Sequence, residues 1–472
     1  MRIECPCGGT TLDNRAGAVH ENCVAAQCPP RLNRMPHRII FDGLNLSLAQ
    51  GTGIATYTRM LTRVARDLGH DVGVVYSTPF TPPADALLRE VAFFDAKRPT
   101  NPVRKKKLTA RKLLNFAIDQ ARYQLPIKPM PVELGSAVIT RQFNDALAVH
   151  DRAFVARNVF ENARTYFFRT RAFAELVFEP SPDVLHCTYP LPLRVRSACN
   201  IYTIHDLVPL RLPFTTSDDK QYLFRLLKKI ARDADHIVTV SENSKRDIIQ
   251  FLGVKETRIT NTYQAVAIPR RYIERSETAV ANQLEGCFGF EMQGYLLYYG
   301  ALEPKKNVGR LIEAYISSGV NLPLVLVIGG GWQNDAEIRL LAEQEARQSS
   351  CSRRRICRLE YVTYSTLVTL IRGARAVVFP SLYEGFGLPV LESMVLGTPV
   401  VASRESSVPE IAGDAALLVD PYDTDEIARA ITTIVNDADL RAELSRRGPL
   451  QAAKFSPDRY RDRVAAMYTS LR

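Results

Sequence analysis

The order of strands, glycine-containing loops and helices constrains this chain most, because the same unit occurs near both ends of the sequence. A short apolar strand, a loop with glycines and a helix follow one another at residues 38–68 and again at residues 376–394. A strand that is apolar throughout is buried on both faces, which is typical of parallel sheets covered by helices. The repeated unit therefore predicts an α/β protein with doubly wound parallel sheets.

Apolar segments of strand length recur in both halves of the chain. A length of 472 residues favours two or three domains, and 46% hydrophobic with 24% charged residues is the composition of a globular protein. Further strands are expected at 72–76, 184–186, 201–204 and 236–240 in the first half, and at 295–299, 324–328 and 400–401 in the second.

These segments define the expected domains. We predict a Rossmann-like domain at residues 35–280 and a second one at residues 281–455. A C-terminal helix at residues 456–472 is expected to pack back toward the first domain. Between about residues 80 and 180 the periodicity is mostly helical, which predicts a helical insertion rather than more sheet.

The first 34 residues lack periodic apolar positions and precede the first strand. They hold four of the nine cysteines, in one C-x-C and one C-x4-C spacing. A zinc ribbon repeats C-x2-C instead, so we expect a disordered extension, with a small zinc site as the alternative. The other cysteines are scattered along the chain, which favours free thiols in a reducing compartment.

The net charge of +11 draws the surface toward anions, among them phosphorylated metabolites and lipid head groups; we expect no nucleic-acid partner. The longest apolar runs, such as residues 322–328, are far shorter than the roughly 20 residues that span a bilayer. The N-terminus lacks the apolar core of a secretory signal. These features predict a cytoplasmic protein.

Residues 104–116 combine six basic residues with interspersed apolar ones, and a helix is expected there. Such a helix can lie on an anionic membrane, although a solvated surface helix explains the pattern equally well. The first interpretation places the protein at the inner face of the plasma membrane and favours a lipid-linked acceptor.

The segment from Phe379 to Glu392 carries the clearest chemical signal. A glycine-containing turn follows a buried strand, and the next helix points its N-terminus at the turn, an arrangement that suits a phosphate group. Glu384 on the loop and Glu392 on the helix stand eight positions apart. Because ionised carboxylates accept several hydrogen bonds, the pair suits hydroxyl-rich sugars.

This E-x7-E segment, together with residues 397–402, 299–307 and 203–206, resembles the retaining glycosyltransferases of the GT-B fold, those of glycosyltransferase family 4. The resemblance extends from about Arg38 to the C-terminus. It implies two doubly wound Rossmann-like domains that face a central cleft. It also implies transfer of a hexose from a nucleotide sugar with retention of anomeric configuration.

The resemblance assigns roles to individual residues of this chain. Glu384 would contact the donor sugar and Glu392 the ribose hydroxyls. Lys306 would meet the diphosphate, assisted by Lys305, because a cation there offsets the charge on the leaving group. The residues expected to line the pyrophosphate and the sugar are Gly385, Phe386, Gly387 and Leu388.

One position departs from the family pattern. Ala301 stands where the family usually has an arginine, five residues before Lys306. We interpret Lys305 as its replacement. The departure also leaves open a weakened enzyme or a catalytically silent protein that binds sugar nucleotides.

The first half contributes further candidates. His205 ends a buried strand, where the family has a histidine beside the donor sugar, and Asp206 either orients an acceptor hydroxyl or caps the following turn. Gly51 and Gly53 form a loop that lets the backbone approach the diphosphate or the acceptor. Ser241, with Ser244, is expected to cap a helix that faces the cleft.

We expect neither a metal nor a cofactor. Three Asp-x-Asp pairs occur, each at a predicted helix boundary, so capping explains them: Asp233 and Asp235, Asp423 and Asp425, Asp437 and Asp439.

The sequence thus favours transfer of a hexose, with mannose from GDP-mannose as the first hypothesis, to a glycan or lipid-linked acceptor. Two alternatives remain: a GT-B isomerase or phosphorylase, and a silent partner in a polysaccharide assembly complex.

Overall fold

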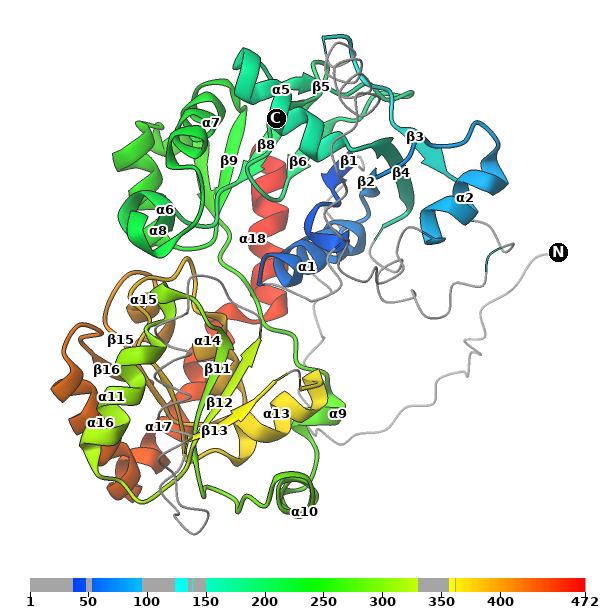
Figure 1. The fold of residues 1–472 in the computed structure, drawn as a ribbon. Coiled ribbons are helices and arrows are strands. Elements are labelled where there is room, and N and C mark those ends of the chain that lie inside the picture. The colour runs from blue at the N-terminus through cyan, green and yellow to red at the C-terminus, as the bar shows by residue number, and fades with distance from the viewer. Residues whose placement is uncertain are drawn as a thin grey trace, which may run out of the picture. The chain divides into compact units, whose positions relative to one another are not determined.

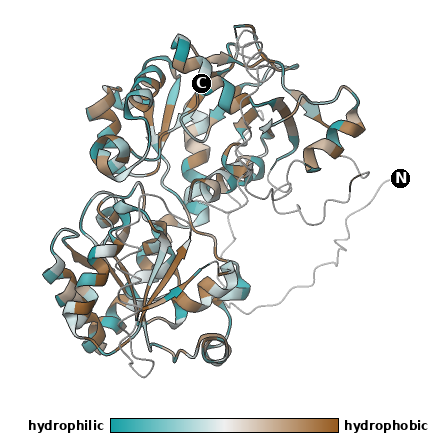
Figure 2. Ribbon diagram, viewed as in Figure 1, coloured by the Kyte–Doolittle hydropathy of each residue, from teal (hydrophilic) through white to brown (hydrophobic). Residues whose placement is uncertain are grey.

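The computed structural model describes residues 37–47, 53–95, 124–134, 138, 150–329, 356–360 and 362–471. The two main sheets of these residues are largely parallel and flanked by helices (Figure 1). A small third sheet pairs β5 (Ala174–Glu175) with β7 (Leu193–Arg194). Apolar strands lie inside and the helices turn hydrophilic sides outward (Figure 2). The architecture is α/β with two Rossmann-like halves, and the sequence prediction of this fold class is confirmed.

The N-terminal half contains the sheet β10-β9-β8-β6-β1-β2-β4-β3. Its parallel strands are β1 (Arg38–Asp42), β2 (Asp71–Thr78), β4 (Arg152–Arg157), β6 (Val184–Cys187), β8 (Cys199–Thr203), β9 (His236–Thr239) and β10 (Ile259–Asn261), and β3 (Met130–Val132) is antiparallel. Its longer helices are α1 (Gly53–Asp67), α2 (Ala86–Asp95), α5 (Val159–Thr170) and α7 (Lys220–Asp233), with the short α6 (Val208–Arg211) and α8 (Glu242–Asp247). Ile39 packs in one core cluster and Ile40 in another, so β1 is buried on both faces.

The C-terminal half contains the sheet β13-β12-β11-β14-β15-β16, with parallel pairing throughout. The strands are β11 (Leu296–Ala301), β12 (Leu324–Gly329), β13 (Ile356–Leu359), β14 (Ala376–Phe379), β15 (Val400–Ser403) and β16 (Leu417–Val419). The helices are α9 (Arg270–Ile273), α10 (Glu277–Phe288), α11 (Val308–Ser318), α13 (Tyr364–Gly373), α14 (Leu388–Val395), α15 (Val408–Ala412), α16 (Thr424–Asn436) and α17 (Ala438–Ala452).

The last helix, α18 (Pro457–Ser470), returns to the N-terminal half and lies beside α1 (Figure 1). Its Tyr468 hydroxyl lies 2.8 Å from Nδ1 of His186 on β6. The other ring nitrogen of His186 lies 3.0 Å from the Thr203 hydroxyl on β8. This buried polar chain joins the end of the sequence to the first sheet.

Two predictions about the domains were wrong, namely the helical insertion and one domain boundary. The segment 80–180 does not consist of helices alone, because β4 within it pairs with β2 over six residues and extends the sheet. Only Ala153, Val155 and Ala156 of β4 are buried, so its apolar signal was too short to recognise. The domain boundary at 280 falls inside α10, whose Val280 and Leu284 pack against the C-terminal half.

Several predictions concern residues outside the described ones, namely the extension 1–34, Gly51 and the basic segment 104–116. Among the described residues, no helix has the length and apolar character needed to cross a membrane.

Candidate functional site

The predicted site residues of both halves follow the carboxyl ends of strands. Lys305 and Lys306 belong to a 3-10 turn (Pro304–Lys306) after β11, and Glu384 lies in the loop after β14. His205 follows β8 in the other half. The carboxyl edge is where open parallel sheets bind ligands.

Lys306 and Glu384 form a buried ion pair. The lysine Nζ lies 2.7 Å from Oε1 and 3.0 Å from Oε2 of Glu384, and only 8% of the glutamate side chain is exposed. Burial alone would raise the pKa of Glu384, but the charges of Lys306 and Lys305 outweigh it and hold this pKa below its ordinary value. The acid is therefore ionised at neutral pH, although it is buried.

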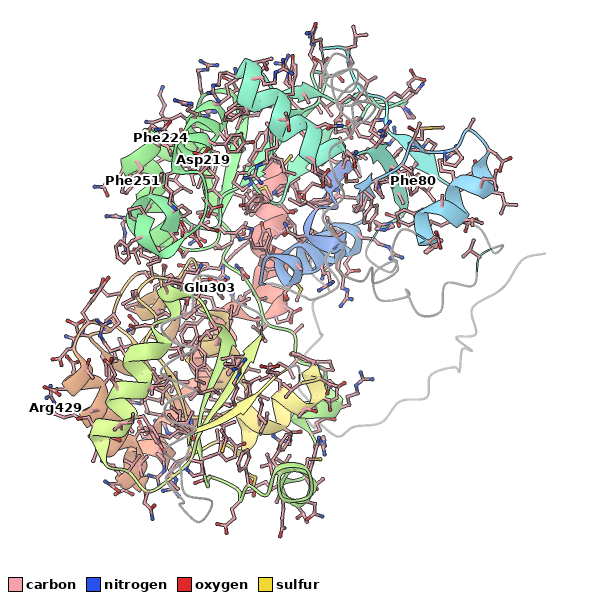
Figure 3. The ribbon with its side chains drawn as sticks, viewed as in Figure 1. Phe80, Asp219, Phe224, Phe251, Glu303 and Arg429 are labelled. Carbon is pink, nitrogen blue, oxygen red and sulfur yellow. The ribbon has the colours of Figure 1, made fainter. Side chains whose placement is uncertain are left out.

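Lys305 is the second cation of this edge. Its Nζ lies 3.7 Å from Oε2 of Glu303, which Figure 3 labels. Burial lowers the pKa of Lys305, but the charges of Asp206, Glu384 and Glu303 prevail and raise it. Two charged lysines thus stand next to each other where the sequence predicts a diphosphate.

The loop that carries Glu384, residues 380–387, is held by two serines; we call it the Glu384 loop. The backbone N–H of Glu384 donates to the Ser406 hydroxyl at 2.9 Å. The Ser407 hydroxyl donates to the carbonyls of Glu384 and Phe386, each at 2.9 Å. Gly387 has φ +105°, a conformation that suits glycine, and begins α14.

The side chain of Phe386 belongs to an apolar cluster. It is buried, with its ring 5.9 Å from Phe455 and 6.5 Å from Tyr263. Only the backbone of Phe386 remains for a ligand of the loop. The prediction that Phe386 lines the pyrophosphate and the sugar therefore stays a prediction, and it concerns the backbone of this residue.

Two glycines mark where the halves approach each other. A Cβ atom on Gly385 would lie 2.8 Å from the His205 carbonyl oxygen and 3.1 Å from Asp206 Oδ2, so no side chain fits there. A Cβ atom on Gly53 would lie 3.4 Å from Leu388. The N-termini of α1 and α14 therefore lie close together.

Glu392 lies on α14, one turn inside the helix. Burial raises the pKa of this carboxyl group to about 7, and the nearby Tyr299 hydroxyl offsets part of the shift. Its charge in turn helps to raise the pKa of the half-exposed Tyr364, after the larger effect of burial. Glu392 therefore titrates near neutral pH, in contrast to Glu384.

His205 is held as a neutral imidazole. Its Nε2–H donates to the Thr188 carbonyl at 2.9 Å, which leaves Nδ1 as the acceptor nitrogen. Burial lowers the pKa of the ring. The neighbouring Asp206 accepts the Val208 N–H at 3.1 Å, so its Oδ1 caps the turn, while Oδ2 faces Gly385.

The sequence missed the contacts that join the halves beside this site. The Glu410 carboxylate accepts the N–H groups of Glu242 and Asn243 at 3.0 and 3.1 Å, and so caps α8 across the boundary. The Tyr383 hydroxyl contacts Asn243, at 2.7 Å, and Asp247. No motif singled out these residues, although Tyr383 directly precedes Glu384.

The serines and the Asp-x-Asp pairs act at helix ends. Ser241 accepts the Ser244 N–H and caps α8, as predicted, and the Ser244 hydroxyl donates to the His205 carbonyl at 2.8 Å. Asp423 caps α16 and Asp437 caps α17.

The remaining pair does not cap a helix N-terminus. Asp233 ends α7 and pairs with Lys229 and Arg232, and Asp235 accepts the Asn200 N–H. The capping prediction is wrong there because α7 ends, rather than begins, at this pair. Within the described part of the chain, no group of three or more metal-ligating side chains comes together.

Comparison with known proteins identifies the family. The sequence matches the families described as "Glycosyl transferases group 1" over residues 288–451 and "Glycosyltransferase Family 4" over residues 135–267. It is 36% identical to the O-antigen chain mannosyltransferase B of Escherichia coli over 271 residues, which cover 56% of this chain and 68% of that protein. The chain belongs to the GT-B glycosyltransferases.

Other comparisons agree with this assignment. The serotype-specific mannosyltransferase WbdA of Escherichia coli is 29% identical over 53% of this glycosyltransferase, which matches only 31% of WbdA. The structure of HepE from Anabaena in complex with UDP-glucose has a TM-score of 0.58 and 16% identity, and covers 92% of this chain and 100% of that one, which shows the shared fold. With mannosyltransferases as relatives, this glycosyltransferase is a hexosyltransferase.

Proposed function

We propose that this enzyme transfers mannose from GDP-mannose to a glycan or lipid-linked acceptor in polysaccharide biosynthesis, with retention of configuration. The mannosyltransferase relatives support the sugar. The observation that carries the proposal is the buried Lys306–Glu384 pair beside Lys305. It brings two cations next to a carboxylate, and we assign the cations to the diphosphate and the carboxylate to the sugar hydroxyls.

In the free enzyme the Lys306 ammonium group donates hydrogen bonds to both oxygens of the Glu384 carboxylate. A bound diphosphate would share the ammonium group, because lysine has three N–H donors. Glu384 would then accept hydrogen bonds from the hydroxyls of the sugar. Both lysines would offset the charge that builds on the diphosphate as it leaves.

The remaining residues hold the ends of the donor. Glu392 would accept hydrogen bonds from the ribose hydroxyls. The backbone of residues 385–388 would face the pyrophosphate. His205 Nδ1 would accept a hydroxyl of the sugar, since its other nitrogen is engaged with Thr188. Gly53 and Asp206 lie at the opposite edge, where the acceptor would enter.

The proposed step follows the front-face route. The bond from the anomeric carbon to the phosphate oxygen breaks, and a bond to the acceptor oxygen forms on the same face. The acceptor proton passes to the leaving phosphate. The protein positions the reactants and stabilises charge, and the proposal assigns no metal or cofactor to the step, so EDTA should leave turnover unchanged.

We further propose a cytoplasmic enzyme that associates with the inner face of the plasma membrane through residues 104–116. Vesicles of anionic and neutral lipid, compared at low and high salt, test this. Equal binding to both kinds of vesicle would refute the proposed membrane association and leave the proposed transferase activity untouched.

The donor is tested by thermal unfolding with GDP-, UDP- and ADP-sugars. A ligand at about 100 times its dissociation constant should stabilise the fold by roughly 2.7 kcal/mol. Product analysis with and without acceptor separates a transferase from an isomerase or phosphorylase. If no nucleotide sugar raises the melting temperature, the proposed function is wrong.

A further inference from the structure

One buried carboxylate of the N-terminal half has no part in the assignments above. Asp42 is the last residue of β1 and is 2% exposed. Burial raises its pKa to about 6, and hydrogen bonds from Thr188 offset part of the shift, so the group is largely ionised at pH 7.5. Asp42 forms no ion pair with another described residue. An acid buried without a cation destabilises a fold, and an apolar residue would be better if Asp42 served packing alone.

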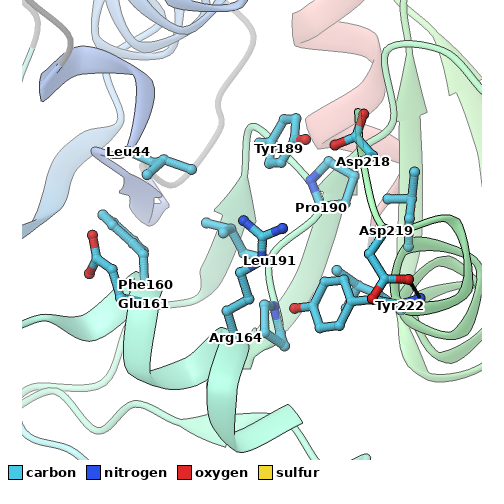
Figure 4. A pocket seen from close by; sticks show the side chains of 13 residues that line it. Leu44, Phe160, Glu161, Arg164, Tyr189, Pro190, Leu191, Asp218, Asp219 and Tyr222 are labelled. Carbon is cyan, nitrogen blue, oxygen red and sulfur yellow. Dashed lines mark hydrogen bonds between the residues drawn. The ribbon is translucent and has the colours of Figure 1, made fainter. Parts of the chain in front are cut away.

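The Asp42 carboxylate binds the segment that follows β6. Its Oδ2 accepts the N–H group of Thr188 and, at 2.8 Å, the Thr188 hydroxyl group. Its Oδ1 accepts the Leu44 N–H at 3.3 Å. Leu44 and Tyr189, which belong to the two segments concerned, face the same cavity (Figure 4). An ionised carboxylate can accept all of these hydrogen bonds because it presents no donor of its own.

Thr188 is fully buried and is bonded through each of its polar groups. Its N–H and its hydroxyl donate to Asp42, and the hydroxyl oxygen lies 3.0 Å from the Thr58 hydroxyl of α1. Its carbonyl accepts the Nε2–H of His205 at 2.9 Å. Because groups on both sides of the Thr188 Cα atom are bonded, its carbonyl has little freedom to turn away from His205.

These contacts run across three neighbouring strands. β1 pairs with β6, and β6 pairs with β8. Asp42 ends the first of these strands, Thr188 follows the second and His205 follows the third. We call Asp42, Thr188 and His205 the edge line, because they lie along the carboxyl edge of the sheet. Any shift at Asp42 is therefore passed on to His205 through a single intermediate residue.

An aromatic contact fixes the His205 ring on a second side. The centre of the Tyr57 ring lies 4.8 Å from the centre of the His205 ring, and the two planes meet at 86°, the edge-to-face arrangement. The Tyr57 hydroxyl lies 3.1 Å from the Thr203 hydroxyl at the end of β8. Packing thus limits how the imidazole can swing, and the Thr188 carbonyl decides which nitrogen carries the proton.

The position of this proton determines what His205 can bind. A carbonyl oxygen only accepts, so it selects the tautomer with the proton on Nε2 and leaves Nδ1 as an acceptor. An imidazole whose nitrogens are not held in this way has no fixed tautomer. Only the tautomer selected by Thr188 can accept a hydroxyl proton at Nδ1, which is the contact proposed for the donor sugar.

We propose that Asp42 is a positioning residue of the transferase: by holding Thr188, it keeps the His205 proton on Nε2 and so keeps Nδ1 available to a hydroxyl of the donor sugar. The inference rests on the proposed function where it assigns the sugar contact. The effect of Asp42 on the His205 proton, by contrast, is a property of the free protein. The edge line adds to the site a buried acid that touches neither the donor nor the acceptor.

Two isosteric variants interrupt the edge line at different points. Asp42→Asn replaces one oxygen by an N–H2 group, which cannot accept from Thr188 or Leu44. Thr188→Val removes the hydroxyl but keeps Asp42, and it decides the matter if Asp42→Asn does not fold. Thr188→Ser restores the hydroxyl. Thr62→Val is the matched control, because Thr62 is equally buried and its hydroxyl donates to carbonyls of its own helix.

The tautomer is measured by NMR on the full-length protein with isotope-labelled histidine, through long-range proton–nitrogen correlations at pH 7.5. The chain has 7 histidines, and the His205 signals are those missing from His205→Gln. Wild type, Thr188→Ser and Thr62→Val should show the Nε2–H form. In Asp42→Asn and Thr188→Val the Nδ1–H form should rise from under about a tenth to about a fifth or more. An unchanged tautomer in the folded variants overturns the inference.

Turnover connects the edge line with the reaction. With GDP-mannose as the donor, kcat/KM should fall about tenfold in Asp42→Asn and in Thr188→Val, and should recover in Thr188→Ser. The affinity for GDP should stay within about twofold of wild type, because the diphosphate lacks the sugar that His205 contacts. An equal loss of GDP affinity, or full turnover despite an altered tautomer, would overturn the positioning role.

Failure of the proposed function gives a different result. If the wild type neither binds nor turns over GDP-mannose or another nucleotide sugar, the proposed function is wrong. The NMR comparison of wild type with Asp42→Asn and Thr188→Val needs no ligand, so it still decides whether Asp42 controls the His205 proton.

Discussion

In the C-terminal half, both candidate acids and the loop between them come from one short segment, residues 384–392. In the N-terminal half, the facing edge is assembled from segments that follow three different strands: Gly43 and Leu44 after β1, Thr188 and Tyr189 after β6, and His205 after β8. A site that comes from one segment can be found from a local motif, whereas a site assembled from several segments exists only once the sheet has formed.

The two halves also differ in the charge state of their buried titratable groups. The C-terminal edge buries an ionised acid against a lysine, while the N-terminal edge keeps buried imidazoles neutral. The predictions that follow test this contrast.

The largest effect should come from Lys306→Met. Removing one partner of a buried ion pair costs about 3–5 kcal/mol of stability, and losing a charge-stabilising donor lowers turnover by about 100- to 1,000-fold. The double variant Lys306→Met/Glu384→Gln should recover stability but not turnover. Chemical denaturation and steady-state rates measure both; a double variant no more stable than the single one would refute the ion-pair account.

The two acids of one segment should have separable roles. Glu392→Ala should weaken binding of the nucleotide diphosphate and of the full donor by about ten- to a hundredfold, since it removes hydrogen bonds to a charged group. Glu384→Ala should spare the diphosphate and lower turnover, because the sugar develops positive charge in the transition state. Calorimetry with the diphosphate and rates with the donor test this, and equal losses of diphosphate affinity would contradict it.

The buried imidazole of the N-terminal half should make the fold sensitive to acid. Burial lowers the pKa of His186 to about 3, against about 6.5 in the unfolded chain. As the pH falls below 6.5, His186 binds a proton in the unfolded state but stays neutral in the folded state. The free energy of unfolding therefore falls. The loss between pH 7.5 and pH 5 should be about 2 kcal/mol.

The variant His186→Gln isolates this effect, since other buried groups titrate equally in both proteins. Its stability should lose about 2 kcal/mol less than the wild type over the same interval. Urea denaturation at the two pH values measures the difference. Parallel losses in both proteins would show that His186 is not the group concerned.

The smallest expected effect concerns Glu392, whose pKa is raised to about 7 by burial. Only the ionised carboxylate accepts from both ribose hydroxyls, so donor affinity should rise with pH, by about tenfold from pH 6 to pH 8. A nucleotide sugar serves as the probe because its diphosphate is esterified at both ends. The variant Glu392→Gln should bind more weakly but without this slope; a slope that persists would assign the titration elsewhere.

The sequence predicted those parts of the molecule whose signal is continuous along the chain. The strands β1, β2, β6, β11, β12 and β14, the helix after the Glu384 loop and the Ser241 cap were all expected near their observed positions. It missed β4, because three buried residues make too weak a pattern. It could not show that the Phe386 ring packs near Phe455 and Tyr263, because a motif does not show which way a ring turns.

From the sequence alone came the α/β class, the two halves and the candidate carboxylates, because apolar periodicity and contiguous motifs are local properties, and the candidate lysines came from the family resemblance. The tertiary structure alone decided that Glu384 is ionised while Glu392 titrates near neutrality, since burial and Lys306 set those pKa values. It likewise decided that Gly385 must be a glycine against His205, and that Asp42 and Thr188 meet at the carboxyl edge of the first sheet. Each depends on groups that lie far apart in the chain and meet only when the strands pair.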